Sequence, residues 1–326
     1  MGRFALYHDP LVLEHGTGRF HPEGPGRVAA CVARLSGEGF LAEAPPSPAR
    51  TGRAIERVHA ASYVERLREA SEAVPDGFPR DQVFTFFDSP DNPTSAATWD
   101  VAVRAVGLSL AASDAVLSGE ARSAFVAVRP PGHHARARSA MGFCFLNSVA
   151  VVARDLVEER GVSRVLVADF DVHHGNGTQE TFWEDGRVAF LSVHRYPFYP
   201  GTGGADETGA GRGAGLTRNV PLPAGSDDAS YAGGFAAALE EMADRFRPEV
   251  VLVSAGFDAH VRDPLGGMAV TGEGYHAMAA ALRSVAGVHA GGRLVALLEG
   301  GYDHQGTAEG ALALARVLAD GSETTH

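Results

Sequence analysis

Short apolar runs rich in β-branched residues recur along this chain, and four of them lead directly into residues that can carry chemistry. The densest example is 165–168, Val-Leu-Val-Ala, which is followed by Asp-Phe-Asp-Val-His-His at 169–174. The other three runs lead to 130–134 (Pro-Pro-Gly-His-His), 254–258 (Ser-Ala-Gly-Phe-Asp) and 299–302 (Glu-Gly-Gly-Tyr). Runs of this kind, bounded by glycine, proline and polar residues, are typical of buried strands. The chain must therefore fold so that several strand ends present functional side chains.

Stretches with helical character separate these runs. We expect strands at 4–7, 124–128, 165–170, 188–193, 250–254 and 294–298. We expect helices at 26–37, 62–72, 95–118, 147–160, 227–245, 272–290 and 307–319. This alternation predicts an α/β fold with three layers, α/β/α, around a mainly parallel central sheet. Parallel strands end at a shared edge, where ligands bind, so the four clusters should converge on one site.

The 326 residues show no long linker, low-complexity block or internal repeat. We therefore expect a single domain over 1–319, followed by a polar tail at 320–326. Two segments rich in Gly, Pro and Asp, 75–94 and 196–217, match neither a strand nor a helix. Loops of this length are usually functional or disordered, and we expect these two at the rim of the site.

Composition excludes several classes of function. The formal charge of −12 argues against nonspecific nucleic-acid binding, which needs a basic surface. No apolar run is long enough for a membrane span and the N-terminus has no signal core, so we expect a cytoplasmic protein without a membrane partner. The chain contains no lysine, which removes lysine Schiff-base chemistry and a P-loop lysine. Its arginine-only, Ala- and Gly-rich composition suggests a high-GC bacterial genome.

The cysteine content excludes two further kinds of site. The only two cysteines, Cys31 and Cys144, are far apart in the sequence and form no Cys-x-x-Cys pair. A disulfide framework or a structural zinc site is therefore not expected.

Three residues are the candidate metal ligands. Asp171 and His173 are two positions apart, so on an extended segment both point to the same side, and Asp258 follows another strand candidate. Two carboxylates and one imidazole suit Zn²⁺ or Fe²⁺ with a position left for water. Such a metal lowers the pKa of its water and polarises a carbonyl. A strand-end turn with solvated acids would explain any one of these residues, but not four clusters that converge.

The adjacent pair His133 and His134 is the candidate acid–base machinery. Neighbouring side chains point in different directions, so one histidine can act as general base and the other as electrostatic partner. Each needs an acceptor on its second ring nitrogen, and Asp169 and Asn176 are the candidates. An aspartate raises the pKa of its histidine whereas an asparagine does not, so the two histidines should titrate differently. The phenol of Tyr302, after two glycines, can donate to a developing oxyanion.

With these motifs the chain resembles the histone deacetylase superfamily, zinc-dependent amidohydrolases related to arginase in fold. More narrowly it is similar to the bacterial class II-like branch of deacetylase-like amidohydrolases and acetylpolyamine amidohydrolases. The resemblance covers about residues 7–319. Its most specific motifs are at 21–27 (His-Pro-Glu-Gly-Pro-Gly-Arg), 130–135, 142–147 (Gly-Phe-Cys-Phe-Leu-Asn), 169–179, 255–258 and 299–302.

The resemblance implies zinc at the three candidate ligands and a role for each catalytic residue. His134 would be the general base and then the general acid, and His133 its electrostatic partner. Tyr302 would be the oxyanion donor. Asp169 would orient His133 and Asn176 would orient His134, because class II members typically have asparagine rather than aspartate at that position.

It also implies a substrate tunnel for an acylated amine. Phe143 and Tyr199, with the neighbouring Gly142, would form the wall around the aliphatic stem of the substrate. Asp88 matches the rim aspartate that grips the substrate backbone. Arg27 would lie near the inner cavity from which acetate leaves.

Monovalent cations, K⁺ above all, are a further implication. One site near the zinc would use Asp169, Asp171, His173 and Ser192. A second would use the chain around Phe182, Asp185 and Val188, where Phe182 offers its carbonyl oxygen.

One departure from the polyamine-selective relatives bears on specificity. They place a glutamate where this chain has Leu265, so an apolar rim favours acyl-lysine-like or uncharged substrates. Acetylpolyamine deacetylation is the alternative, and an inactive acyl-lysine-binding protein is a remote one, because no ligand, base or tyrosine is missing. Arginase needs more acidic ligands than are found here. The segment 75–89 is where some acetylpolyamine enzymes carry a dimer-building insertion, so a homo-oligomer stays open.

Overall fold

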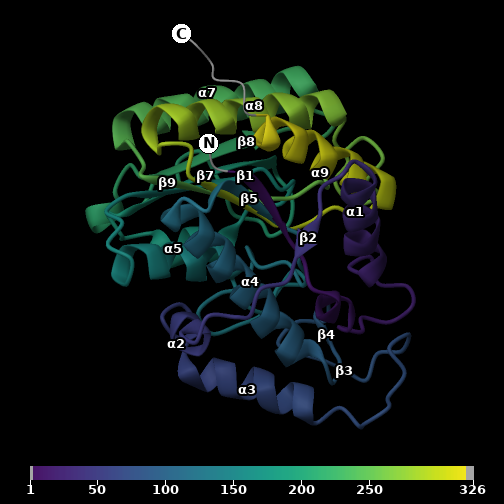
Figure 1. Ribbon diagram of the computed structural model, residues 1–326. Coiled ribbons are helices and arrows are strands. Elements are labelled where there is room, and N and C mark those ends of the chain that lie inside the picture. The colour runs from purple at the N-terminus through teal and green to yellow at the C-terminus, as the bar shows by residue number, and fades with distance from the viewer. Residues whose placement is uncertain (1–2, 321–326) are drawn as a thin grey trace.

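The computed structural model describes residues 3–320, which are built around an eight-stranded sheet (Figure 1). Its strands follow the order β2-β1-β5-β10-β9-β6-β7-β8, and each neighbouring pair is parallel. The strands are β1 (Arg3–Tyr7), β2 (Ala42–Glu43), β5 (Ala121–Val126), β6 (Val165–Asp169), β7 (Val188–Arg195), β8 (Thr217–Leu222), β9 (Val250–Ala255) and β10 (Leu294–Leu298). The prediction of a parallel central sheet is confirmed.

Helices cover both faces of this sheet, which gives the predicted three layers (Figure 1). One layer contains α1 (Pro25–Gly37), α7 (Asp228–Phe246), α8 (Gly272–His289) and α9 (His304–Ala319). The other contains α4 (Thr98–Ser118), α5 (Ser148–Glu158) and α6 (Asn176–Phe182), with α2 (Thr51–Glu56) and α3 (Ala61–Glu72) outside α4. Short elements complete the described chain: η1 (Pro10–Leu13), η2 (Gly211–Gly213) and the two-stranded pair β3 (Thr85–Phe86) and β4 (Pro93–Thr94).

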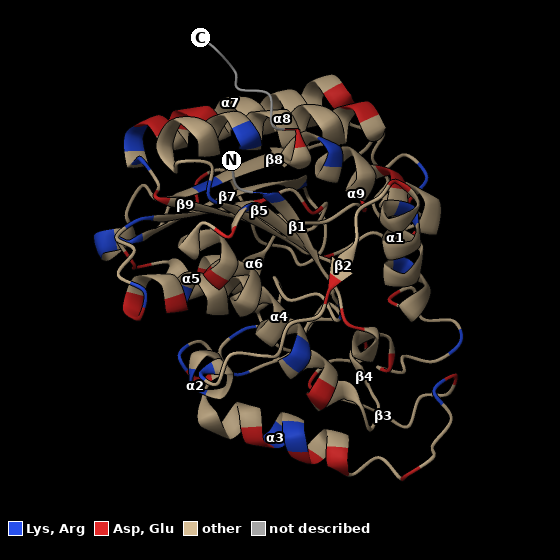
Figure 2. Ribbon diagram, viewed as in Figure 1, with Lys and Arg blue, Asp and Glu red and all other residues tan. Residues whose placement is uncertain are grey.

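The apolar composition of the strands explains their central place. Every residue of β6, β9 and β10 is buried, as expected for parallel strands that are covered on both faces. Charged residues lie mainly in the helices and loops, and few lie in the sheet (Figure 2). Among the charged residues of the described strands, Asp169 is the buried one, at the carboxyl end of β6.

One described helix, α4, is long and apolar enough to cross a membrane by length and composition alone. However, 67% of the window that passes this test is buried inside the fold. A core helix passes the same test, so α4 is weak evidence for a membrane span. Its place between the sheet and the outer helices explains its apolar sequence.

Six strands were expected and all six occur, although β5 begins and ends earlier than 124–128. The structure adds β8, which begins at the last residue of the predicted loop 196–217 and was not expected as a strand. It is an edge strand whose residues 220–222 are only partly buried, and it contains Pro221, so it lacks the apolar signal of the inner strands. It also adds α6, which at seven residues is too short for a periodic pattern. The predicted tail lies outside the described residues except for Asp320.

Candidate active site

Strand order explains why distant parts of the sequence meet. β5, β10, β9 and β6 are consecutive neighbours in the sheet. Their carboxyl ends therefore bring together the loops that begin near residues 127, 299, 256 and 170. The predicted convergence of the four clusters is confirmed.

The candidate metal ligands form one group. Ligand atoms of Asp171, His173 and Asp258 all lie within 4.8 Å of one another. His173 Nδ1 is 3.0 Å from Asp171 Oδ1 and 3.1 Å from Asp258 Oδ2. Both carboxylates are fully buried, and the His173 side chain is only 12% exposed. Two carboxylates and an imidazole at this spacing fit a catalytic Zn²⁺ or Fe²⁺.

The electrostatics of this group also favour a cation. Burial, and then the charge of Asp171, raise the pKa of Asp258 to about 7. Burial opposes protonation of His173, but hydrogen bonds to Asp171 and Asp258 outweigh it and raise its pKa to about 9. Two adjacent buried carboxylates are costly to ionise without a positive partner. Gly300 leaves room for them, because a Cβ atom there would lie 2.1 Å from Asp258 Oδ2.

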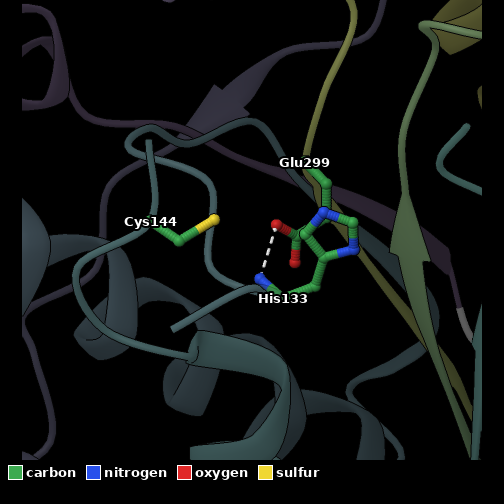
Figure 3. Close-up of side chains that lie close together, drawn as sticks. All are labelled: His133, Cys144 and Glu299. Carbon is green, nitrogen blue, oxygen red and sulfur yellow. Dashed lines mark hydrogen bonds between the residues drawn. The ribbon is translucent and has the colours of Figure 1, made fainter. Parts of the chain in front are cut away.

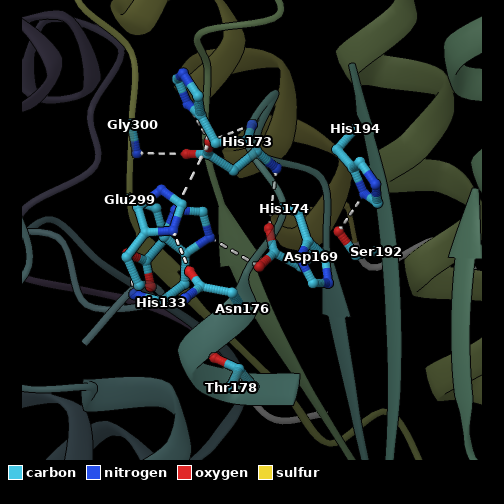
Figure 4. Close-up of polar contacts among 12 residues, drawn as sticks. His133, Asp169, His173, His174, Asn176, Thr178, Ser192, His194, Glu299 and Gly300 are labelled. Carbon is cyan, nitrogen blue, oxygen red and sulfur yellow. Dashed lines mark hydrogen bonds and ion pairs between the residues drawn. The ribbon is translucent and has the colours of Figure 1, made fainter. Parts of the chain in front are cut away.

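The two histidines have the partners that the sequence predicted. His133 Nδ1 lies 2.9 Å from Asp169 Oδ2 (Figure 4). His134 Nδ1 lies 2.8 Å from Asn176 Oδ1. The ring centroids of the two histidines are 4.0 Å apart. Each ring is therefore fixed by an acceptor on its Nδ1, which leaves its Nε2 for chemistry.

These partners make the two histidines titrate differently, as predicted. Burial lowers the pKa of His133, but the charges of Asp169 and Asp171 outweigh it and raise the pKa to about 10. Burial, and then the charges of His133 and His173, hold the pKa of His134 well below its usual value. At neutral pH, His133 is therefore the cationic partner and His134 is the neutral imidazole that a general base must be.

A second group of metal-type side chains, His133, Cys144 and Glu299, is a support rather than a metal site (Figure 3). Glu299 Oε2 accepts hydrogen bonds from Gly132 N at 2.5 Å and His133 N at 3.1 Å. The Cys144 thiol donates to Gly142 O at 3.2 Å, and burial raises its pKa well above its usual value. Because the thiol stays protonated and the carboxylate is engaged, this group holds the backbone of the histidine pair.

Tyr302 lines the same cavity as His173, one of the candidate metal ligands. Its ring makes an edge contact with Phe143, at 5.7 Å between centroids, and the Arg27 guanidinium lies 4.9 Å from its centroid. Arg27 is fully buried, donates from Nε to Gly301 O at 2.5 Å and forms a 2.9 Å ion pair with Glu23. Arg27 thus contacts both the ring of Tyr302 and the backbone of the residue before it.

A cavity of about 140 Å³ connects these groups with solvent. It is lined by Asp91, His134, Gly142, Phe143, His173, Tyr199, Leu265 and Tyr302. The predicted wall residues Gly142, Phe143 and Tyr199 are therefore placed together, with Leu265 37% exposed at the cavity. Gly142 has a φ of +58°, and a Cβ atom there would lie 2.3 Å from the His134 ring, so only glycine fits.

The structure does not bring Asp88 into this lining. Its carboxylate forms a 2.8 Å ion pair with Arg66 and accepts a hydrogen bond from Ala140 N at 3.1 Å. The acid that lines the cavity is Asp91, which accepts from Gly142 N at 3.2 Å and from the Tyr199 phenol at 3.4 Å. The sequence carried a signal for it, because both acids lie in one Asp-x-x-Asp segment, but spacing alone could not select between them.

A larger cavity of about 910 Å³ lies on the other side of Met141 and Asn176. Its lining mixes arginines with acidic residues and includes none of the three candidate metal ligands. Size therefore does not mark the reactive centre, whereas the convergent donor groups do.

Residues expected at the cation sites lie in two places. Asp169 and Ser192 are register partners on β6 and β7, and Ser192 Oγ lies 2.9 Å from His194 Nδ1. Asp185 forms 2.7 Å ion pairs with Arg154 and Arg187. Phe182 and Val188 are buried on either side of Asp185, so their side chains belong to the core. Cation binding at either place stays a prediction.

Comparison with known proteins gives the family of this chain. A model of the histone deacetylase domain matches residues 21–318. The chain belongs to the histone deacetylase family.

Relatives in this family extend over most of the chain. A probable deacetylase of Archaeoglobus fulgidus is 37% identical, over 92% of this chain and 81% of its own length. A histone deacetylase-like amidohydrolase of Pseudomonas aeruginosa is 39% identical, over 92% of this chain and 82% of its own. The solved structure of the HDA15 HD domain superposes with a TM-score of 0.88 at 35% identity, over 99% of this chain and 90% of that one. These likenesses support a deacetylase or amidohydrolase activity.

Proposed function

We propose that this protein is a zinc-dependent amidohydrolase that removes acetyl, or another short acyl group, from the amine nitrogen of acyl-lysine-like substrates. The observation that carries the proposal is one 140 Å³ cavity lined by a neutral histidine, a metal-binding histidine and a tyrosine phenol. Family membership supports the class of reaction. The donor set of two carboxylates and one imidazole supports zinc.

The residues that would hold the metal are Asp171, His173 and Asp258. When bound, such a metal lowers the pKa of its water and polarises the substrate carbonyl. His134 accepts the proton of the attacking water, because its imidazole is neutral and Asn176 fixes its orientation. It then returns that proton to the departing amine nitrogen. His133, held protonated by Asp169, offsets the negative charge that develops beside it.

The cavity walls position the substrate. The Tyr302 phenol donates a hydrogen bond to the oxyanion. Burial raises the pKa of the phenol well above its usual value, so the proton stays on the phenol oxygen. Phe143 and Tyr199 flank the aliphatic stem. Asp91 takes the rim role that the family resemblance suggested for Asp88, and accepts an N–H of the substrate at the cavity mouth.

Acetylpolyamines are the second candidate substrates. The Asp91 carboxylate at the cavity and the formal charge of −12 favour a cationic ligand. Leu265 counts against them, because an apolar side chain stands where a carboxylate would meet a distal ammonium. Acyl-lysine-like substrates are therefore the preferred proposal.

A side-by-side rate comparison tests both candidates. Acetyl-lysine peptides, acetylpolyamines and longer acyl-lysines are supplied to the zinc-loaded enzyme, with the Tyr302→Phe variant as the matched control. We expect the largest kcat/KM with acetyl-lysine peptides and a large loss in the control. A larger kcat/KM with acetylpolyamines would favour the second candidate, and no hydrolysis of any acylated amine would refute the proposed function.

We also propose K⁺ at the predicted cation sites and a cytoplasmic location. The buried acid Asp169, opposite Ser192 on the next strand, supports a cation there. The two cysteines, Cys31 and Cys144, are buried free thiols, which is usual for proteins of reducing compartments.

A further inference from the structure

A buried carboxylate outside the described chemistry joins two segments of the active site. Asp263, only 8% exposed, lies in the loop that follows the metal-binding residue Asp258. Its Oδ1 accepts hydrogen bonds from Leu265 N at 2.9 Å and Gly266 N at 3.1 Å. Its Oδ2 accepts from Tyr302 N at 2.6 Å and from the next backbone N–H at 3.3 Å. One carboxylate therefore receives four backbone N–H groups from two parts of the chain.

The Oδ1 half fixes the loop against the metal-binding residues. Gly266 packs so closely that a Cβ atom there would lie 1.7 Å from Asp258 O. Leu265, held by the same oxygen, lines the substrate cavity. The position of this loop is thus set from Asp263 on one side and Asp258 on the other.

The Oδ2 half fixes the backbone of the residue that carries the phenol. The bond to Tyr302 N is short, and hydrogen bonds from backbone N–H groups to a buried carboxylate are strong. Phe143 and Arg27 contact the ring of Tyr302, and Arg27 also donates to Gly301 O, which holds the peptide group before Tyr302 from the side of α1. Asp263 is the side chain that ties this Cα atom to the loop after Asp258.

We propose that Asp263 is a positioning residue for deacylation, which sets the Tyr302 phenol relative to the metal-binding residues and Leu265 relative to the cavity mouth. The inference rests on the proposed function and adds a residue that the chemistry does not otherwise use. A displacement of about 1 Å can cost about 10²-fold in rate when a reacting group is misplaced. A carboxylate that controls the backbone of Tyr302 should therefore act on kcat.

The alternative is an ordinary loop anchor, whose loss lowers stability without any specific link to Tyr302. The two roles differ in their coupling. If Asp263 works through the phenol, its substitution should matter little once the phenol has been removed. A double-mutant cycle measures this coupling directly.

The test compares wild type, Asp263→Asn, Tyr302→Phe and the double variant, all zinc-loaded and folded at the assay temperature. Asparagine keeps the shape of the side chain but replaces one accepting oxygen with an NH₂ group. We expect Asp263→Asn to lose on the order of 10- to 100-fold in kcat, with KM changed by less than about threefold. In the Tyr302→Phe background the same substitution should cost less than about threefold.

Asp228→Asn is the matched control. Asp228 accepts hydrogen bonds from Thr271 N at 2.8 Å and Thr271 Oγ1 at 2.7 Å, before α8 and away from the cavity lining. It should lower the melting temperature while leaving kcat within about twofold of wild type. If Asp263→Asn does not fold, Asp263→Glu serves in the same cycle, because it keeps the charge but displaces the oxygens by one methylene.

Equal losses of kcat in the wild-type and Tyr302→Phe backgrounds would overturn the inference, as would unchanged kcat in a folded Asp263 variant. A wild-type enzyme that hydrolyses no acylated amine would overturn the proposed function instead. The wild-type rate therefore separates the two failures.

Discussion

Replacing Asn176 with aspartate should move the acid limb of the pH–rate profile to higher pH. His134 Nδ1 lies 2.8 Å from the uncharged Asn176 Oδ1, and burial and neighbouring histidines hold the pKa of His134 well below its usual value. At nearly the same distance, 2.9 Å, Asp169 helps to raise the pKa of His133 to about 10. The neighbouring residue His133 therefore already has the kind of histidine–aspartate pair that the variant would create at His134.

The size of the shift follows from the geometry. An imidazolium and a carboxylate joined by such a bond have charge centres about 4 Å apart, which gives about 4 kcal/mol at an effective dielectric constant of about 20. At about 1.36 kcal/mol per pKa unit, this corresponds to a ceiling of roughly 3 units. Burial of the new pair offsets part of it, so we expect the pKa of His134 to rise by about 1 to 3 units.

The sign of the effect on rate is fixed by the role of His134. A base works only when neutral, so a higher pKa means that activity appears at higher pH. Asn176 is the first residue of α6, where a negative charge interacts favourably with the helix dipole. The variant should therefore fold, and its new carboxylate should stay ionised.

The assay is kcat/KM for an acetyl-lysine peptide from about pH 5 to about pH 10, which reports the pKa values of the free enzyme. Asn176→Ala is the control, because it removes the acceptor without adding charge and should lower the rate without raising the acid limb. Metal content is measured in both variants. An acid limb that stays in place, or moves to lower pH, in the folded and metal-loaded aspartate variant would refute the assignment of His134 as the base.

Four further substitutions test the ligands, the oxyanion donor and the rim. Asp258→Ala or His173→Ala should remove most bound metal and nearly all activity, because each is one of the three proposed protein ligands; stoichiometric metal by elemental analysis in both variants would contradict this. Tyr302→Phe should keep metal and fold but lose on the order of 10²–10³ in kcat, whereas wild-type turnover would show that another group polarises the carbonyl. Leu265→Glu should shift the kcat/KM ratio roughly tenfold toward acetylpolyamines, about 1 kcal/mol at a partly exposed rim. That shift should shrink with added salt, and an unchanged ratio would mean that Leu265 does not meet the distal ammonium.

The chemistry-bearing residues with strong local context could be found from the sequence. Asp171 and His173 are two residues apart after a buried strand, and Asp258 follows another such run. Both the alternation of strands with helices and the shared edge of a parallel sheet are consequences of local pattern. The pairs His133–Asp169 and His134–Asn176 also followed from the rule that a catalytic histidine needs a partner on its second nitrogen.

Other features depend on contacts between segments that are distant in sequence. Asp88 and Asp91 share one segment, and only the packing of that segment against residues 140–143 places Asp91 in the cavity and pairs Asp88 with Arg66. The support of His133 by Glu299 joins residues 166 positions apart. No periodicity or spacing encodes such bonds, since they form only when β5 and β10 become neighbours.

The sequence by itself determined which strands are buried, that they run parallel, and which side chains stand at their ends, because burial and periodicity are written in local residue order. The tertiary structure decided which of these side chains touch, and therefore which proton each one carries. His133 and His134 are adjacent and chemically identical, yet one is held protonated and the other neutral. The difference arises from the acids and cations that folding brings around each ring, because a pKa in a protein interior depends on burial and on the charges within a few ångströms, wherever in the chain they come from.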